Sequence, residues 1–169
     1  MTNEERNEIW LAKIKVRDYL PPEFPTIVCL CGSTRFGDAF KDALRTETLA
    51  GRIVLSVGLL GHAEGIDMDG PVKVMLDELH CRKIDMSDEV LILNVLQPAC
   101  SECGAWFRWA PDDDLNPIRV PTCNCGLQPE GAHAVQVPYI GASTERELAY
   151  ARKRGKVIRF LNPESEVTS

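Results

Sequence analysis

Four short apolar runs, each bounded by polar residues, glycine or proline, are the clearest pattern along the chain. They cover residues 26–31, 53–57, 89–95 and 157–161. Runs of this length that are rich in β-branched side chains are typical of strands with both faces buried. We therefore predict four strands inside a sheet that is covered on both sides.

Amphipathic segments separate the predicted strands. Apolar residues at spacings of three and four predict helices over residues 3–19 and 34–49, from residue 71 onward, and over 144–154. In the second and third helices we expect the core-facing residues to be Phe36, Phe40, Leu44, Leu49, Val72, Met75, Leu76 and Leu79. Gly51 and Gly155 directly follow two of these helices, a position where glycine commonly ends a helix.

The alternation of strands and helices predicts the architecture. Right-handed crossovers of this kind build a mainly parallel sheet, so we expect a single α/β domain over residues 1–169. Ligands bind such sheets beyond the carboxyl ends of the strands, where the winding direction reverses. The candidate binding segments are therefore residues 32–35, the loop 58–70 and the approach to Thr144.

Composition and charge argue against several classes of protein, namely nucleic-acid-binding, secreted and membrane proteins. The formal net charge of -6 provides no general attraction to nucleic-acid backbones or anionic membranes. Charged residues are spread through the first twenty positions, which is unlike a signal peptide. No apolar run approaches the roughly 20 residues that a membrane span needs. We expect a soluble, cytoplasmic protein.

About forty residues separate the third predicted strand from the last helix, where a few would suffice. This insertion, residues 97–138, contains two close cysteine pairs, Cys100 with Cys103 and Cys123 with Cys125. Four thiolates at this spacing predict one structural Zn²⁺ ion in a closed tetrahedral shell. The alternatives are two reactive or disulfide-bonded pairs, or a site in which His133 replaces one cysteine.

The other cysteines have a simpler interpretation. The total of seven is odd, which argues against a complete disulfide framework. Cys29, Cys31 and Cys81 lie in apolar or helical contexts, where we expect them to pack as small hydrophobic side chains.

The insertion does not have the composition of a nucleic-acid reader. Its aromatic residues Trp106, Phe107 and Trp109 are able to stack on bases. However, the insertion has only two basic residues, both arginines, against five acidic ones, and nucleic-acid binding requires a basic surface. We expect this module to serve as a scaffold, a lid or a subunit contact.

Gly32, Ser33, Thr34 and Arg35 lie where the first strand passes into a helix. Backbone N–H groups, the helix dipole, two hydroxyls and a guanidinium converge there, which suits a phosphate or a ribose hydroxyl. A serine N-cap after a glycine turn would explain the same residues without a ligand. The G-x-G-x-x-G and P-loop patterns are both absent, so we expect neither NAD(P) binding nor ATP hydrolysis.

Two roles are open for Glu147. Thr144 and Glu147 have the spacing of a capping box, with Thr144 as the N-cap residue. A carboxylate in the first turn of a helix is also held ionised by the helix dipole, which suits a nucleophile. The two roles can coexist.

Three segments resemble the nucleoside 2-deoxyribosyltransferase superfamily, including its nucleoside-monophosphate N-glycosidases. They are Cys31-Gly-Ser-Thr-Arg35, Lys83-Ile-Asp-Met-Ser-Asp88 and Tyr139-Ile-Gly-Ala-Ser-Thr-Glu-Arg-Glu-Leu-Ala-Tyr-Ala151. The likeness covers most of residues 26–161 except the insertion. It implies a flavodoxin-like fold with helices on both faces of the sheet, and a homodimer or higher homo-oligomer.

The resemblance also implies a mechanism. Glu147 matches the family's nucleophilic glutamate, which attacks C1′ of a ribosyl or deoxyribosyl group and displaces the base. Ser33 and Arg35 would contact the sugar or the 5′-phosphate from one turn, and Gly141 and Ser143 from the opposite turn. His80 stands where the family has a second acidic residue, and is either a general acid, a group that orients the sugar, or a histidine on a helix flank.

We therefore expect cleavage or exchange of the N-glycosidic bond of a small nucleoside or nucleotide, with His62 and Asp67 as contacts on the base side. A non-catalytic nucleotide sensor, whose zinc insertion contacts a partner protein, is the alternative. A zinc-dependent nucleic-acid adaptor is a third class that the acidic insertion disfavours.

Overall fold

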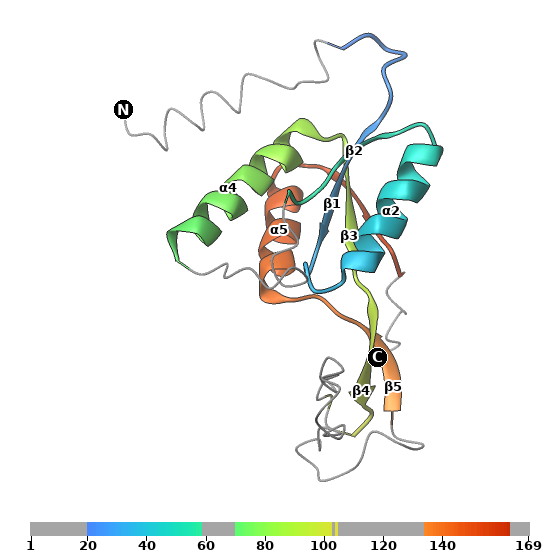
Figure 1. Ribbon diagram of the computed structural model, residues 1–169, viewed down its shortest axis with the longest axis vertical. Helices are drawn as coiled ribbons and strands as arrows, with labels where there is room; N and C mark the ends of the chain where they lie inside the picture. Colours follow the sequence, from blue (N-terminus) through green and yellow to red (C-terminus); the bar gives the residue numbers. More distant parts are fainter. Residues whose placement is uncertain (1–19, 59–69, 103, 105–133, 163–169) are drawn as a thin grey trace, which may run out of the picture. The chain divides into compact units, whose positions relative to one another are not determined.

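The computed structural model describes residues 20–58, 70–102, 104 and 134–162. Its elements, in chain order, are β1 (Ile27–Gly32), α2 (Gly37–Leu49), β2 (Ile53–Leu55), α4 (Pro71–Met86), β3 (Glu89–Leu93), β4 (Leu96–Cys100), β5 (Ala134–Pro138), α5 (Ala142–Lys153) and β6 (Val157–Phe160) (Figure 1). All four predicted strands are confirmed, as are the three predicted helices that fall on described residues. The helix predicted over 3–19 lies outside the described residues.

Two compact units divide the chain. The first falls within Met1–Leu93 and Ile140–Pro163 and contains the parallel sheet and its helices, and the second falls mainly within Asn94–Tyr139. The predicted insertion, residues 97–138, lies within the bounds of the second unit. Among the described helices, none is long and apolar enough to cross a membrane.

The sheet of the first unit has the strand order β2-β1-β3-β6, and all its pairings are parallel. Since β2 lies on one side of β1 and β3 on the other, the winding direction reverses between β1 and β3. This order is compatible with a flavodoxin-like fold, whose ligands bind at that reversal. Gly32, the last residue of β1, pairs there with Leu93 at the end of β3.

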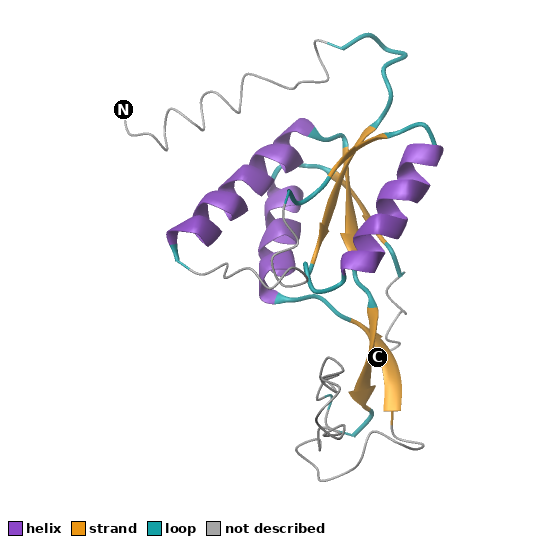
Figure 2. Cartoon of the chain, in the orientation of Figure 1, coloured by secondary structure: helices purple, strands orange, loops and turns teal. Residues whose placement is uncertain are grey.

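Helices cover both faces of the sheet because the central strands are apolar on both sides (Figure 2). On one face, β1 and β3 pack against α4 and α5; its buried residues are Cys29, Cys31, Ile84, Val90, Ile92, Leu148 and Ala151. On the other, the same strands pack against α2; its buried residues are Val28, Leu30, Phe40, Ala43, Leu91 and Leu93. The α/β architecture predicted from the alternating elements is confirmed.

The predicted core face of α2 is partly wrong. Leu44 and Leu49 are 44% and 78% exposed, whereas the buried positions are Phe40, Ala43 and Glu47. The helix also begins at Gly37 rather than at residue 34, because residues 33–36 form a turn closed by the Phe36 N–H and the Ser33 carbonyl. Helical periodicity predicted that the leucines would be buried. It did not predict the burial of Glu47, whose carboxylate has arginine partners.

The predicted apolar stripe of α4 is also largely exposed. Val72, Met75 and Leu79 are each about half exposed, and the buried residues of the helix are His80 and Ile84. Only the carboxyl half of α4 therefore packs closely on the sheet. This packing brings His80, rather than an apolar residue, into the core.

The second unit contains a β-hairpin that the sequence pattern did not predict. Strands β4 and β5 pair antiparallel, from Leu96 opposite Pro138 to Cys100 opposite Ala134. Ala99 and Cys100 are buried. The alternation Val135-Gln-Val137 was the signal for β5, but it is too short to stand out beside the cysteine pairs.

Gly32 should not tolerate a side chain. A Cβ atom added there would lie 2.9 Å from the Leu93 Cβ atom and 3.5 Å from the Phe40 ring. We expect Gly32→Ala to lower the free energy of unfolding by about 1–2 kcal/mol through overpacking. Gly58→Ala is the matched control, because its nearest neighbour would be the Lys83 Nζ atom at 3.9 Å. Equal urea midpoints for the two variants would contradict the close β1–β3 approach.

Candidate functional site

Glu147 lies in α5, just beside the helix face that packs on the sheet. The buried residues of that face are Thr144, Leu148 and Ala151. The helix begins at Ala142 with Gly141 as its N-cap, and no side chain caps it. The predicted capping box is therefore wrong: Thr144 lies inside the helix and is buried. Helical spacing then turns the Glu147 side chain toward β1 and α4.

The side chains of His80 and Glu147, two of the predicted catalytic residues, lie close together. The His80 Nε2 atom lies 3.8 Å from the Glu147 Oε1 atom, and their side chains are 6% and 16% exposed. The same Nε2 atom lies 3.3 Å from the Cys31 Sγ atom. Since Cys31 directly precedes Gly32, the three side chains gather at the carboxyl end of β1.

Burial determines the protonation of this cluster. Desolvation, with a smaller contribution from Asp77, raises the pKa of Glu147 to about 8, although the Cys31 thiol and two nearby cations oppose the shift. Burial likewise lowers the pKa of His80 to about 4. At neutral pH the carboxyl is therefore mainly protonated and the imidazole neutral, so their contact is not an ion pair.

Two expectations about charge are thus corrected. The helix dipole does not keep Glu147 ionised at neutral pH, because the residue lies beyond the first turn and desolvation dominates. Nor can His80 serve as an imidazolium acid near neutral pH, since its charged form is disfavoured by burial. A neutral imidazole can still donate or accept a hydrogen bond.

Cys29 extends the cluster along β1. Cys29, Cys31 and His80 each place one ligand atom within 4.8 Å of the others, and all three residues are buried. Two thiols and an imidazole are donors that Zn²⁺ and related cations prefer. The group could therefore hold a metal ion. This group was not predicted from the sequence, although strand alternation places Cys29 and Cys31 on one face of β1.

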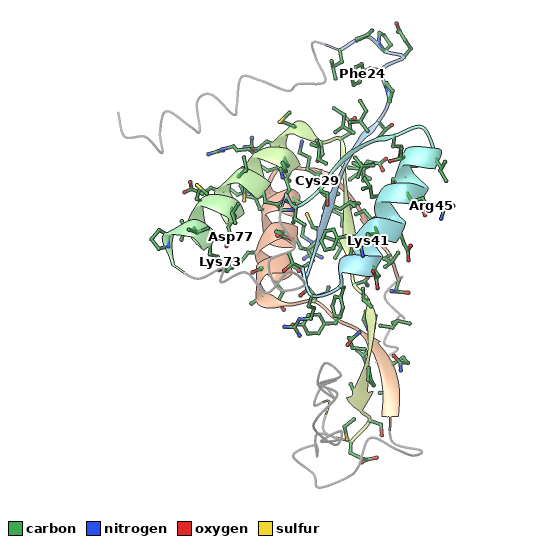
Figure 3. The ribbon with its side chains drawn as sticks, in the orientation of Figure 1. Phe24, Cys29, Lys41, Arg45, Lys73 and Asp77 are labelled. Atoms are coloured by element: carbon green, nitrogen blue, oxygen red, sulfur yellow. The ribbon has the colours of Figure 1, made fainter. Side chains whose placement is uncertain are left out.

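Charged and hydroxyl groups connect α4 with the first turn of α5. The Lys73 Nζ atom donates to both Asp77 carboxylate oxygens at 3.1 Å and to the Ser143 hydroxyl at 3.3 Å. Arg146 donates to the same hydroxyl at 3.1 Å and to Asp77 at 3.4 Å. Figure 3 labels Lys73 and Asp77 on α4. Ser143 was a predicted site residue, but its charged neighbours were not predicted. The one sequence signal for them was the i, i+4 spacing of Lys73 and Asp77.

The predicted glycine turn follows β1 directly. Gly32 is buried, Ser33 and Thr34 are half-buried, and Arg35 is exposed. Ser33 does not cap α2, whose N-cap is Phe36 without a side-chain hydrogen bond. The turn thus follows Cys31 directly in the chain, and the capping role that sequence alone offered for Ser33 is not observed.

Asp85 and Asp88, which follow His80 in the chain, both have structural partners. Asp85 accepts hydrogen bonds from the Tyr150 hydroxyl at 3.0 Å and from the Arg154 Nε atom at 2.7 Å, which joins α4 to α5. Asp88 accepts from the Ile27 N–H at 2.9 Å, at the amino end of β1. Asp85 therefore serves to join the two helices, and Asp88 lies at the amino end of β1, whereas the cluster lies at its carboxyl end.

Several predicted site residues cannot be placed. His62 and Asp67, expected on the base side, lie outside the described residues. So do Cys103, Cys123 and Cys125 of the predicted zinc site, whereas Cys100 is buried at the end of β4. The four-cysteine zinc site stays a prediction.

Comparison of the chain with protein-family models, curated proteins and solved structures found no match.

Proposed function

We propose that the protein cleaves or exchanges the N-glycosidic bond of a small nucleoside or nucleoside monophosphate, as in the nucleoside 2-deoxyribosyltransferase superfamily. The observation that supports this most is the position of Glu147. Its carboxyl group lies 3.8 Å from His80 at the carboxyl end of β1, beside the strand-order reversal where α/β sheets bind ligands.

In the proposed reaction, a Glu147 carboxylate oxygen attacks C1′ and the bond from C1′ to the base nitrogen breaks. Its electron pair leaves with the base, which takes up a proton. A water molecule or a second base then attacks C1′ and releases the carboxylate, which gives hydrolysis or exchange with retained configuration. His80 would position the carboxylate or the sugar by hydrogen bonding, since its low pKa makes it a poor proton donor.

The groups around Ser143 would receive the 5′ end of the substrate. Lys73 and Arg146 both donate to the Ser143 hydroxyl at the start of α5, where the helix dipole also favours an anion. A phosphate there would compete with Asp77 for the two cations. Ser33 and Arg35 would contact the same end of the substrate from the turn after β1.

Base release is the direct test of this proposal. The protein would be incubated with a panel of ribo- and deoxyribonucleosides and their monophosphates, with and without a second free base, and the products separated by chromatography. We expect release of free base from at least one substrate, or formation of a new nucleoside when the second base is present. No release and no exchange across the panel would contradict the proposal.

A non-catalytic nucleotide sensor is the second candidate, because a mainly protonated Glu147 is a poor nucleophile at neutral pH. The sensor would bind a nucleotide without turnover, and its affinity would survive Glu147→Ala. Calorimetry on the wild type and this variant, with the same substrate panel, distinguishes the two functions.

The raised pKa of Glu147 predicts an alkaline activity profile. The attacking group must be ionised, so kcat/KM, which reports the free enzyme, should rise about tenfold per pH unit up to about pH 8 and then level off. Initial rates of base release across this range, with no metal added, give the profile. A flat profile between pH 6 and 8 would show that the ionisation of Glu147 does not limit the reaction.

We further propose that Cys100, Cys103, Cys123 and Cys125 bind a structural Zn²⁺ ion, that the protein is cytoplasmic, and that it forms a homodimer or higher homo-oligomer. The support is the spacing of the cysteines and, for the assembly, the sequence resemblance. The insertion rejoins the first unit just before the turn at Gly141, so the zinc would help to fix the turn that precedes Glu147.

A further inference from the structure

We propose that Cys29, Cys31 and His80 form a second metal site, for Zn²⁺ or a similar thiol-preferring divalent cation, with Glu147 as its fourth ligand. This site differs from the four-cysteine site of the insertion in its residues, its donor set and its compact unit. Its three core donors come from two elements, β1 and α4, and the fourth comes from α5.

The backbone already brings the donors together. Residues two apart in a strand point to the same face, so β1 presents both thiols to the side covered by α4 and α5. In a tetrahedral zinc site, metal–ligand bonds of about 2.0–2.3 Å place the donor atoms roughly 3.4–3.8 Å apart. The Cys31–His80 and His80–Glu147 separations are 3.3 and 3.8 Å, so small side-chain movements would suffice to enclose a metal.

Unsatisfied polar atoms distinguish this cluster from an ordinary core. The Glu147 Oε2 and His80 Nδ1 atoms are buried without a hydrogen-bond partner among the described residues. Buried polar atoms usually have partners, and an exception indicates a functional group, a water molecule or an ion. A bound cation would give the Glu147 carboxylate a partner, and its charge would stabilise the two thiolates.

The donor set also suggests which cation binds. Two thiols, one imidazole and one carboxyl supply sulfur, nitrogen and oxygen, a set that suits Zn²⁺ and excludes Mg²⁺ or Ca²⁺ as the preferred ion. Thiol and carboxyl groups bind metals in their deprotonated forms, so binding would release their protons to solvent.

If Glu147 is the nucleophile of the proposed function, the metal-bound form is inactive. The carboxylate oxygen that would attack C1′ is then committed to the cation. This consequence rests on the proposed function, whereas the metal site itself does not.

The test compares metal stoichiometry in reduced, metal-free preparations of the full chain. Co²⁺ titration, followed by the absorption of thiolate-bound cobalt, counts the sites in the wild type, in Cys29→Ser/Cys31→Ser and in Cys81→Ser. We expect the double variant to bind one equivalent fewer than the wild type. The matched control Cys81→Ser should bind as many as the wild type, because Cys81 follows His80 directly but is not part of the donor group. Equal stoichiometry in the wild type and a folded double variant would overturn the proposal.

A measurement on the wild type covers the case in which the double variant does not fold. The chain has only three histidines, so His80 can be assigned in ¹H–¹⁵N spectra by comparison with His62→Gln and His133→Gln. We expect Zn²⁺ to shift the His80 Nε2 resonance strongly. An unchanged resonance at saturating Zn²⁺ would mean that Cys31 and His80 form a hydrogen-bonded core pair only.

Substrate assays separate this inference from the proposed function. The loss of one metal equivalent in the double variant supports the site even if no substrate releases a base. If the wild type releases base but binds no more metal than the folded double variant does, the metal site is overturned and the proposed function stands. For Glu147→Gln we expect unchanged stoichiometry and at least about tenfold weaker Zn²⁺ binding at this site.

Discussion

Replacing Glu147 with glutamine should reduce kcat/KM for base release by at least about a thousandfold, because an amide cannot form the glycosyl ester. The fold should survive. Burial raises the pKa of the carboxyl to about 8, so the folded chain already disfavours its charge, and a neutral isostere has no ion pair to lose at neutral pH. The assay is product release from the best substrate of the panel, beside a thermal unfolding curve.

Glu145→Gln is the matched control. Glu145 lies on the same helix two residues earlier, is exposed, and has the same side chain. We expect near wild-type kinetics from this variant. If Glu147→Gln releases base as fast as Glu145→Gln does, Glu147 is not the nucleophile and the glycosidase mechanism proposed for this site is wrong.

The architecture was predictable because strand signals in this chain are local. Residues 27–32 and 89–93 are nearly continuous apolar runs, and such runs fit only strands buried on both faces. The helices between them then force a parallel sheet. By contrast, the β4–β5 hairpin lies in the second unit, where Pro98 and Gln136 interrupt the apolar pattern, so its pairing had no comparable local signal.

The faces of the helices were less predictable because burial depends on distant partners. The core side of α2 includes Glu47, whose hydrogen-bond partner Arg159 lies 112 residues later. In α4 the residue that reaches the core is His80, while three apolar residues at regular spacing remain exposed. Helical periodicity cannot foresee either outcome, since it treats charged side chains as solvent-facing.

The same limit applies to the candidate site. The sequence resemblance was enough to single out His80 and Glu147, although it did not state that their side chains meet. Their protonation was not predictable, because desolvation there combines side chains from β1, α4 and α5. Cys29 and Cys31 were interpreted as hydrophobic residues, and only the approach of His80 shows that these thiols have a donor group beside them.

Replacing Glu47 with glutamine should lower the free energy of unfolding by about 2–3 kcal/mol at neutral pH. This side chain is 8% exposed and accepts hydrogen bonds from Arg159 at 2.8 and 3.1 Å and from Arg52, so it joins α2 to β6. The variant would remove the buried carboxylate that both guanidinium groups share, although Arg159 would keep Glu89 as a partner, and the loss of several charge-assisted hydrogen bonds is costly. Urea unfolding at pH 7 measures the difference. Asp38→Asn, which disrupts the exposed Lys41–Asp38 pair, is the matched control and should have little effect.

The acid dependence of this difference tests its electrostatic origin. Hydrogen bonds from Arg159 lower the pKa of Glu47 below 4.5, the value it would have without these interactions. A carboxyl whose folded pKa is depressed contributes stability that is complete above its unfolded pKa and is lost as the pH falls through the folded pKa. The gap between wild type and Glu47→Gln should therefore be constant from pH 8 to about pH 5 and should shrink below about pH 4.5. A gap that persisted undiminished at pH 3 would mean that the ionised carboxylate is not what joins α2 to β6, and that the loss comes from packing around the substituted side chain.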